Sequence, residues 1–167
     1  MYLVRSTSKT DYCYYLKAFK KSHFKLYSNN ITIDNLEEYI INLVITKYSN
    51  VYRFVIEKED SPIGFFHLYN KEIDTIEISM GLFKSYNSIY GAYIVALSIQ
   101  KAFSFEHVTQ VIATIDKNNL VSQKIVMSLG AKEGVSLNNK NYLYLKKNDF
   151  PNDFFRKIIN RIKINEK

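Results

Sequence analysis

The stretch DKNNLVSQKIVMSLGAKEG, from Asp116 to Gly134, decides how this chain folds. It follows VIATI, Val111 to Ile115, a short run rich in β-branched residues that predicts a strand. Asn119 stands at the expected N-cap of a helix, because an Asn side chain can accept a hydrogen bond from the free N–H groups of the first turn. Gly130 stands just past the last turn, where glycine takes a left-handed conformation without strain. The stretch therefore predicts a strand, a capped helix and a second strand in succession.

The composition of the whole chain indicates one globular domain. Its 167 residues suit a single domain, and 47% of them are hydrophobic, which is enough for a sizeable core. No apolar run approaches the roughly 20 residues that span a bilayer, and the first residues lack the pattern of a signal peptide. The single cysteine, Cys13, excludes an intrachain disulfide and is expected in the core of a first helix. We therefore expect a cytoplasmic protein without stable membrane insertion.

The net charge of +7 suits an anionic partner such as nucleic acid, anionic lipid or a phosphate-rich cofactor. Apart from Lys20-Lys21 and a cluster near the C-terminus, however, the basic residues are scattered along the chain. A dedicated nucleic-acid site concentrates its charge on one face, so we expect no nucleic-acid partner. The three histidines, His23, His67 and His107, have no metal-ligand spacing, and we expect no metal.

Hydrophobic periodicity predicts the remaining elements. Apolar residues at helical spacing predict helices near Lys9 to Lys21, around Leu36 to Val44, and from Tyr90 to Phe103. Further strands are predicted at Met1 to Arg5, Tyr52 to Lys58, Ile63 to Tyr69, Thr75 to Phe83 and in a last hairpin that turns at Asn138 and Asn139. In the strand that begins at Thr75, one face carries Ile76, Ile78, Met80 and Leu82.

The order of these elements, β, α, α, β, β, β, α, β, α, β, β, resembles the GNAT family of N-acetyltransferases over residues 1–150. An Asn, a Ser three residues on, a helix and a Leu-Gly pair are similar to the C-terminal half of that fold. The segments FVIE, PIGF, EI and AF look closest to the branch that acetylates ribosomal-protein N-termini, polyamines and nucleotide-linked amino sugars. The resemblance implies an α/β (α+β) fold, a mixed and mostly antiparallel central sheet of six to seven strands with about four helices on both faces.

The last segment, residues 151–167, extends beyond the usual end of that fold. Apolar residues at helical spacing alternate there with basic ones, which predicts an amphipathic basic helix. We expect this helix to dock on its own domain or on a second subunit of a homodimer, with an anionic membrane or another partner as the alternatives.

The resemblance implies that acetyl-CoA is the co-substrate and that it binds where the fourth strand leads into the next helix. The family pattern there is Q/R-x-x-G-x-G/A, and this chain reads YNSIYGAY, Tyr86 to Tyr93. One register places Gly91 at the last glycine, and a one-residue slip places Ala92 there instead; either register loses a glycine and the usual form of the basic or amide residue. The alternative is a family-like fold whose cofactor site has decayed or changed ligand. The expected cofactor-binding residues are Gly81, Leu82, Asn87, Tyr90, Gly91, Ala92, Asn119 and Ser122.

The resemblance also implies roles for catalytic groups. An amine must lose a proton before it attacks a thioester, and Glu77 on the fourth strand is expected to be the general base, acting through water. A backbone N–H near Met80 to Leu82 is expected to stabilise the oxygen that gains charge. The family's tyrosine acid for the departing thiolate is replaced by Val126, and Tyr142 is expected to substitute for it, with Tyr144 as the alternative.

These residues lead to the hypothesis of an N-acetyltransferase that moves acetyl from acetyl-CoA to a primary amine of a small molecule or a peptide. A nucleotide-linked amino sugar suits the basic charge, whereas a polyamine would need an acidic pocket. A protein N-terminus is the remaining alternative. The rival hypothesis is a non-catalytic module that keeps the fold and binds another ligand, or binds a partner through residues 151–167.

Overall fold

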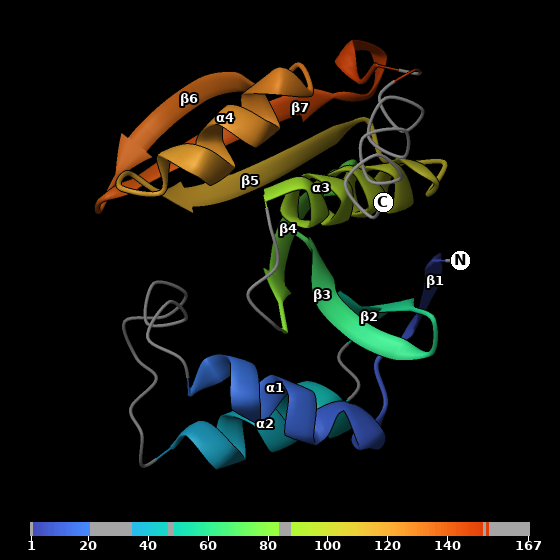
Figure 1. Ribbon diagram of the computed structural model, residues 1–167. Helices are drawn as coiled ribbons and strands as arrows, with labels where there is room; N and C mark the ends of the chain where they lie inside the picture. Colours follow the sequence, from blue (N-terminus) through green and yellow to red (C-terminus); the bar gives the residue numbers. More distant parts are fainter. Residues whose placement is uncertain (1, 21–34, 47–48, 84–87, 152, 154–167) are drawn as a thin grey trace.

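A mixed seven-stranded sheet with the order β1-β2-β3-β4-β5-β7-β6 forms the centre of the protein (Figure 1). The computed structural model describes residues 2–20, 35–46, 49–83, 88–151 and 153. Its strands are β1 Tyr2–Ser6, β2 Val51–Lys58, β3 Ser61–Asn70, β4 Thr75–Leu82, β5 Gln110–Asp116, β6 Lys132–Leu137 and β7 Lys140–Lys146. Neighbouring strands are antiparallel except β4 and β5, which run parallel. The mixed, mostly antiparallel sheet expected from the sequence is thereby confirmed.

Helices cover both faces of this sheet. A short 3₁₀ turn, Lys9–Asp11, leads into α1, Tyr12–Phe19, which packs with α2, Leu36–Ile45, on one face. The other face carries α3, Ser88–Phe103, and α4, Leu120–Ser128. In Figure 1 the pair α1 and α2 lies below β2 to β4, while α4 lies against β5 and β7. The four helices follow from the apolar stripes of the sequence, since each buries one such stripe against the sheet.

Two apolar cores result, one on each face. From Phe65 to Leu68, the alternation of β3 sends Phe66 and Leu68 into the larger core beneath α3 and α4, and sends Phe65 into the smaller core beneath α1 and α2. The Phe65 ring lies 4.7 Å from that of Tyr15, centroid to centroid. On β4 the same alternation buries Ile76 and Ile78 in the larger core. Glu77, which stands between them in sequence, therefore belongs to the face of α1 and α2.

The tight turns have the backbone that their sequences predict. Asn138 and Asn139 both have positive φ, 48° and 61°, and close the β6–β7 hairpin. Gly130, with φ 94°, ends α4 as predicted, and its N–H donates to the carbonyl of Met127 at 3.0 Å. An added Cβ there would lie 2.5 Å from the carbonyl oxygen of Asp149, so only glycine fits this position.

One expectation for the first helix was wrong. Cys13 is exposed, whereas the buried residues of α1 are Tyr15 and Ala18. Three positions separate Tyr15 from Ala18, so they share a face of the helix, and Cys13 is rotated away from it by about 200° relative to Tyr15. The predicted helix in the segment 151–167 lies outside the described residues, apart from residues 151 and 153.

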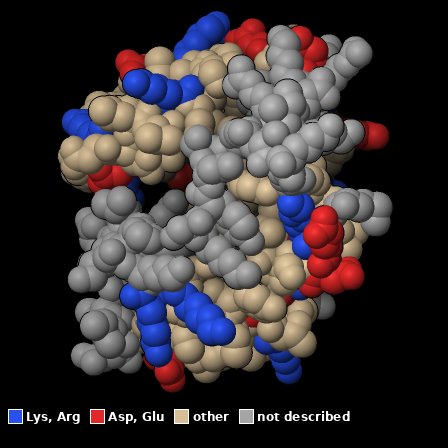
Figure 2. Space-filling model, viewed as in Figure 1, with Lys and Arg blue, Asp and Glu red and all other residues tan. Residues whose placement is uncertain are grey.

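Charged side chains of both signs are distributed over the face shown in Figure 2. Within the described part of the chain, no helix is both long enough and apolar enough to cross a membrane.

Candidate active site

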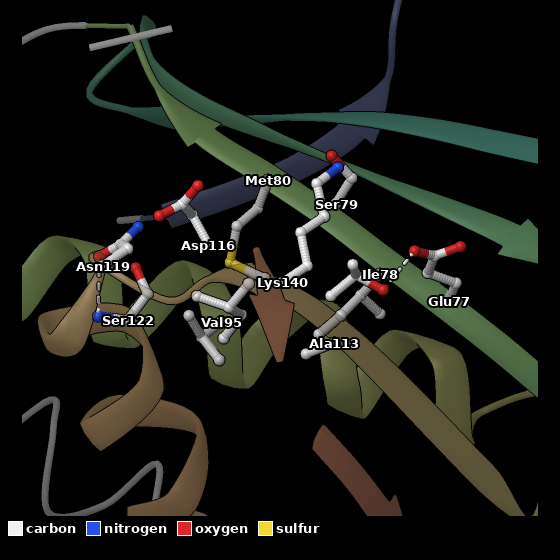
Figure 3. A pocket seen from close by; sticks show the side chains of 12 residues that line it. Glu77, Ile78, Ser79, Met80, Val95, Ala113, Asp116, Asn119, Ser122 and Lys140 are labelled. Carbon is white, nitrogen blue, oxygen red and sulfur yellow. Dashed lines mark hydrogen bonds between the residues drawn. The ribbon is translucent and has the colours of Figure 1, made fainter. Parts of the chain in front are cut away.

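The central feature of the candidate site is a gap between β4 and β5. The two strands pair only from Thr75 and Gln110 to Ile78 and Ala113, although both continue beyond that point. A cavity of about 160 Å³ lies where they separate. Its lining residues come from β4, β5, α3, the start of α4 and β7: Glu77, Ile78, Ser79, Met80, Val95, Ala113, Thr114, Ile115, Asp116, Asn119, Ser122 and Lys140. In Figure 3, Glu77 lies at one end of this cavity and Asn119 with Ser122 at the other.

Backbone groups of β4 face into the gap. The N–H of Phe83 donates to Ile63 on β3 at 2.9 Å, and the β3–β4 register runs without a shift back to Ile76. Because hydrogen-bonding direction alternates along an antiparallel ladder, Gly81 also faces β3, whereas Met80 and Leu82 direct their N–H groups toward the β5 side. Of the backbone N–H groups in this part of β4, those of Met80 and Leu82 therefore face the gap, and that of Gly81 does not. No bulge occurs at Gly81, because the register is continuous through it.

Glu77 is held between two partners that sequence reasoning missed. Thr114 donates its hydroxyl to Glu77 Oε1 at 2.7 Å, and Lys71 Nζ lies 2.6 Å from Glu77 Oε2. Thr114 is on the same face as Glu77 because it stands two positions beyond Ile112, the partner of Glu77 in the parallel register. The side chain of Glu77 is 22% exposed. The carboxylate thus lies fixed at the edge of the cavity, within reach of a group that enters it.

The opposite end of the cavity is the N-terminus of α4. Asn119 accepts a hydrogen bond from the N–H of Ser122 at 3.2 Å, which confirms the predicted cap. Asp116, which the sequence analysis did not single out, accepts from the N–H of Asn118 at 2.8 Å and from Nδ2 of Asn139 at 3.2 Å. Lys140 pairs with Asp116 in the β5–β7 ladder and extends across the gap toward Ser79 (Figure 3). This end combines a helix N-terminus, a carboxylate and an ammonium group.

A buried amide ties the last hairpin to this helix end. Gln123 is 7% exposed and donates to the backbone carbonyls of Asp116 and Lys117 at 2.9 and 3.0 Å. Its own carbonyl accepts from Nδ2 of Asn141, 3.1 Å away on β7. These bonds fix the β5–α4 turn relative to β7 because every polar atom of the Gln123 amide has a partner.

The N-terminus of α3 is the second helix end near the gap. A Cβ built on Gly91 would meet no other atom within 4 Å, so the space beside this backbone is open. The hydroxyl of Tyr90 accepts from Lys58 Nζ at 3.2 Å, and Ala92 follows Gly91 in the same turn. Asn87, the other expected contact, lies outside the described residues. Open backbone at a helix N-terminus is the arrangement that receives phosphate groups.

Tyr142 does not line the cavity. It pairs with Thr114 in the β5–β7 ladder and so lies on the face that carries Glu77, one strand further from the gap. The neighbouring candidate, Tyr144, packs over Gly134, where an added Cβ would clash with its ring. Val126, at the family's tyrosine position, is buried in the larger core.

His67 has a structural environment. The ring is 2% exposed, with Nε2 3.1 Å from the Tyr15 hydroxyl and Nδ1 3.3 Å from the Tyr69 hydroxyl. Burial, with a smaller effect from Arg53, lowers the pKa of His67 to about 3, so the ring is neutral. Burial also raises the pKa of Tyr69 to about 12, and that hydroxyl stays protonated beside Glu77, its cross-strand partner.

A comparison with protein families matches residues 3–132 to the family described as the acetyltransferase (GNAT) domain. No curated protein sequence matches the chain.

Solved structures of several acetyltransferases resemble the fold. Aminoglycoside acetyltransferase AAC(6')-Ib in complex with coenzyme A has a TM-score of 0.72 at 15% identity, over 89% of this chain and 96% of that one. The Campylobacter jejuni N-acetyltransferase PseH in complex with acetyl coenzyme A has a TM-score of 0.67 at 15% identity, over 88% and 99%. Spermidine N-acetyltransferase from Vibrio cholerae, in complex with CoA and spermine, has a TM-score of 0.70 at 14% identity, over 89% and 96%. Identities this low establish similarity of fold.

Proposed function

The chain belongs to the GNAT family of acetyltransferases, and we propose that it transfers acetyl from acetyl-CoA to the primary amine of a small molecule that also carries an anionic group. Enzymes of this family use acetyl-CoA as co-substrate. The observation that carries the proposal is the gap beyond Ile78 and Ala113, with a carboxylate at one end and a capped helix N-terminus at the other.

The residues around the gap fit acetyl-CoA. Gly91 leaves open space at the first turn of α3, where backbone N–H groups can receive the pyrophosphate. The gap between the strands gives the pantetheine arm a place beside backbone polar groups of β4. Asn119 and Ser122 line the far end of the same cavity. We propose that Gly91, Ala92 and Tyr90 border the pyrophosphate, and that Met80, Leu82, Asn119 and Ser122 border the arm.

Acetyl-CoA supplies an acetyl group activated as a thioester. We propose that Glu77 takes a proton from the incoming ammonium group, directly or through one water, because a protonated amine has no lone pair for the attack. The nitrogen–carbon bond then forms as the carbon–sulfur bond breaks. The N–H of Met80 stabilises the carbonyl oxygen as it gains charge. The departing sulfur takes the second proton that the amine nitrogen releases; Tyr142, the acid expected from the sequence, does not line the cavity.

The charges at the cavity support the proposed acceptor class. Glu77 attracts an ammonium group, while Lys140 extends across the gap and attracts an anion. A nucleotide-linked amino sugar carries both groups, and it also suits the net charge of +7. A polyamine carries no anionic group to pair with Lys140, and Asp116, the carboxylate at that end of the cavity, already accepts hydrogen bonds from Asn118 and Asn139. A peptide N-terminus with an acidic residue nearby is the second acceptor that fits these charges.

The test is direct. Calorimetry with acetyl-CoA should show binding, and release of free CoA thiol should follow when primary amines are added. Acetyl transfer should be faster to nucleotide-linked amino sugars than to spermidine or kanamycin. The Lys140→Gln variant should show a smaller difference in rate between these acceptors. Absence of acetyl-CoA binding up to millimolar concentration would rule out the enzymatic proposal and favour the rival hypothesis of a non-catalytic binding module.

We also propose that residues 1–150 are sufficient for catalysis. A chain truncated before Pro151 should keep acetyl transfer, because the gap and both helix ends lie within residues 75–140. A binding module that relies on residues 151–167 would instead lose its partner on truncation.

A further inference from the structure

Lys71 holds a primary ammonium group against Glu77, the proposed base. It begins the turn between β3 and β4, and its backbone N–H donates to the carbonyl of Thr75 at 3.1 Å. From there its side chain reaches back along the sheet, and Nζ lies 2.6 Å from Glu77 Oε2. Glu77 lines the cavity and is the proposed base. A primary ammonium of the chain itself therefore makes the contact that the substrate ammonium must make.

Other lysines with described contacts have different surroundings. Lys58 donates to Tyr90, and Lys101 lies over the ring of Phe54. Lys132 forms an ion pair with Asp149 at 3.4 Å, on the outside of the β6–β7 hairpin. Lys140 lines the cavity, and the end of its side chain lies toward Ser79 (Figure 3). Among these lysines, Lys71 is therefore the one whose ammonium group contacts Glu77, the proposed base.

The side chain of Lys71 is also free to move. It is 51% exposed, and a lysine side chain has four rotatable bonds on a flexible stem. An ion pair with this much exposure contributes little to stability. Nζ can therefore leave the carboxylate, or approach the gap next to it, at small cost.

We propose that the enzyme acetylates its own Lys71, an inference that rests on the proposed acetyl transfer. Glu77 takes one proton from the Lys71 ammonium and passes it to solvent. Nζ then attacks the thioester carbon, so that the nitrogen–carbon bond forms and the carbon–sulfur bond breaks. The second proton leaves Nζ and ends on the CoA sulfur. The products are Nε-acetyl-Lys71, free CoA and one released proton, and no other reactant is needed.

This reaction has two consequences. It stops after one acetyl group per chain, and it removes the positive charge that neutralises Glu77. An external acceptor competes with Lys71 for the same carboxylate, so a good acceptor protects Lys71. A decrease in Lys71 acetylation when an amine is added therefore indicates that this amine enters the site.

The experiment uses the full chain incubated with acetyl-CoA alone, followed by peptide mass spectrometry. Lys132 is the matched control, since it is an exposed lysine paired with a carboxylate outside the cavity. Labelling by acetic anhydride gives the intrinsic reactivity of both lysines. After this correction, Lys71 should be acetylated about 10²-fold faster than Lys132, the lower end of what a general base contributes. The rate constant should not change with protein concentration, because the reaction occurs within one chain.

Glu77→Gln separates enzymatic from spontaneous acetylation. An enzymatic reaction slows in this variant because the base is lost, whereas spontaneous acetylation rises because the ion pair is lost. Circular dichroism and acetyl-CoA binding verify that the variant is folded. Equal acetylation of Lys71 and Lys132, or faster acetylation of Lys71 in Glu77→Gln, overturns the proposal.

In a parallel experiment, CoA release is measured after a panel of primary amines is added. Turnover of an amine without preferential Lys71 acetylation overturns the inference and leaves the proposed function intact. Failure of both reactions overturns the proposed function and the inference together.

Discussion

Ile78 on β4 and Ala113 on β5 are the last partners in the parallel ladder, and beyond them the two strands diverge. The cavity lies at this divergence, with Glu77 just before it on β4 and Asn119 just after the end of β5. The gap exposes backbone groups that a sheet would normally pair. Changes at Glu77, Met80, Gly91 and Asn119 test the proposed chemistry, Gly64 serves as the control for Gly91, and a change at His67 tests the buried histidine.

Replacing Glu77 with Gln should lower kcat by about 10²–10⁴ because the general base is lost. Acetyl-CoA affinity should stay unchanged, since Glu77 lies at the end of the cavity opposite to Asn119. Steady-state kinetics and calorimetry measure the two quantities separately. Thr114→Val, which removes only the 2.7 Å hydrogen bond to Glu77, should have a smaller effect on kcat. Equal turnover of Glu77→Gln and the parent chain would exclude Glu77 as the base.

Met80→Pro should remove the proposed donor to the thioester oxygen. Proline lacks an N–H, and the N–H of Met80 faces the gap, so the ladder with β3 loses no hydrogen bond. We expect kcat to fall by about 10²–10³, as for the loss of one donor of this kind. Met80→Leu keeps the donor and should retain most of the activity. A folded Met80→Pro variant with normal kcat would assign the donor to another residue.

Gly91→Ala should affect stability and binding in opposite directions. Apart from the adjacent residues and the backbone of α3 itself, the new Cβ meets no atom within 4 Å, and alanine favours a helix over glycine by about 0.5–1 kcal/mol. The free energy of unfolding should therefore stay the same or rise. Acetyl-CoA affinity should fall, because the Cβ takes space proposed for the pyrophosphate. Calorimetry and urea denaturation measure both effects, and unchanged affinity would remove Gly91 from the cofactor site.

Gly64→Ala is the control for Gly91→Ala, because the same substitution is made where the backbone is closely packed. A Cβ at Gly64 would clash with Ile94 Cδ1 and lie 2.6 Å from the carbonyl oxygen of Gly81. Overpacking of this kind typically lowers the free energy of unfolding by about 1–3 kcal/mol. Urea denaturation should therefore show a lower free energy of unfolding for Gly64→Ala and an equal or higher one for Gly91→Ala.

Asn119→Ala should destabilise the protein by about 0.5–2 kcal/mol, because the N–H of Ser122 loses its cap. Asn119→Ser keeps a capping oxygen and should restore most of that stability. If the Asn119 amide also contacts acetyl-CoA, both variants should bind it more weakly. Normal acetyl-CoA affinity in Asn119→Ser would limit Asn119 to the helix cap.

His67 should make stability depend on pH in mildly acidic solution. Burial lowers its pKa to about 3 in the folded protein, while an unfolded histidine titrates near pH 6.5. The unfolded state therefore binds more protons between these values, so the free energy of unfolding decreases as the pH falls below about 6.5. One such group gives a slope of up to about 1.4 kcal/mol per pH unit. Urea denaturation at several pH values should show a shallower slope in His67→Gln, and equal slopes would contradict the assignment.

Local patterns in the sequence determined much of the fold. The alternation from Thr75 to Leu82 predicted which side of β4 is buried, because successive strand side chains point to opposite faces. Asn119 and Gly130 predicted the ends of α4, because capping depends on the backbone within a few residues. The pattern was insufficient for Cys13, since α1 has apolar residues on several faces and only its contact with the sheet selected Tyr15 and Ala18.

The sequence by itself determined the order of strands and helices, the family resemblance and the position of Glu77 on a strand. Only the tertiary structure decided where the β4–β5 ladder stops, and that Thr114, Lys71 and Lys140 meet around the resulting gap. The physical reason is the range of the interactions. Turns, caps and alternation depend on neighbouring residues, whereas the hydrogen bond from Thr114 to Glu77 joins residues 37 positions apart, and Lys140 lines the same cavity from another strand.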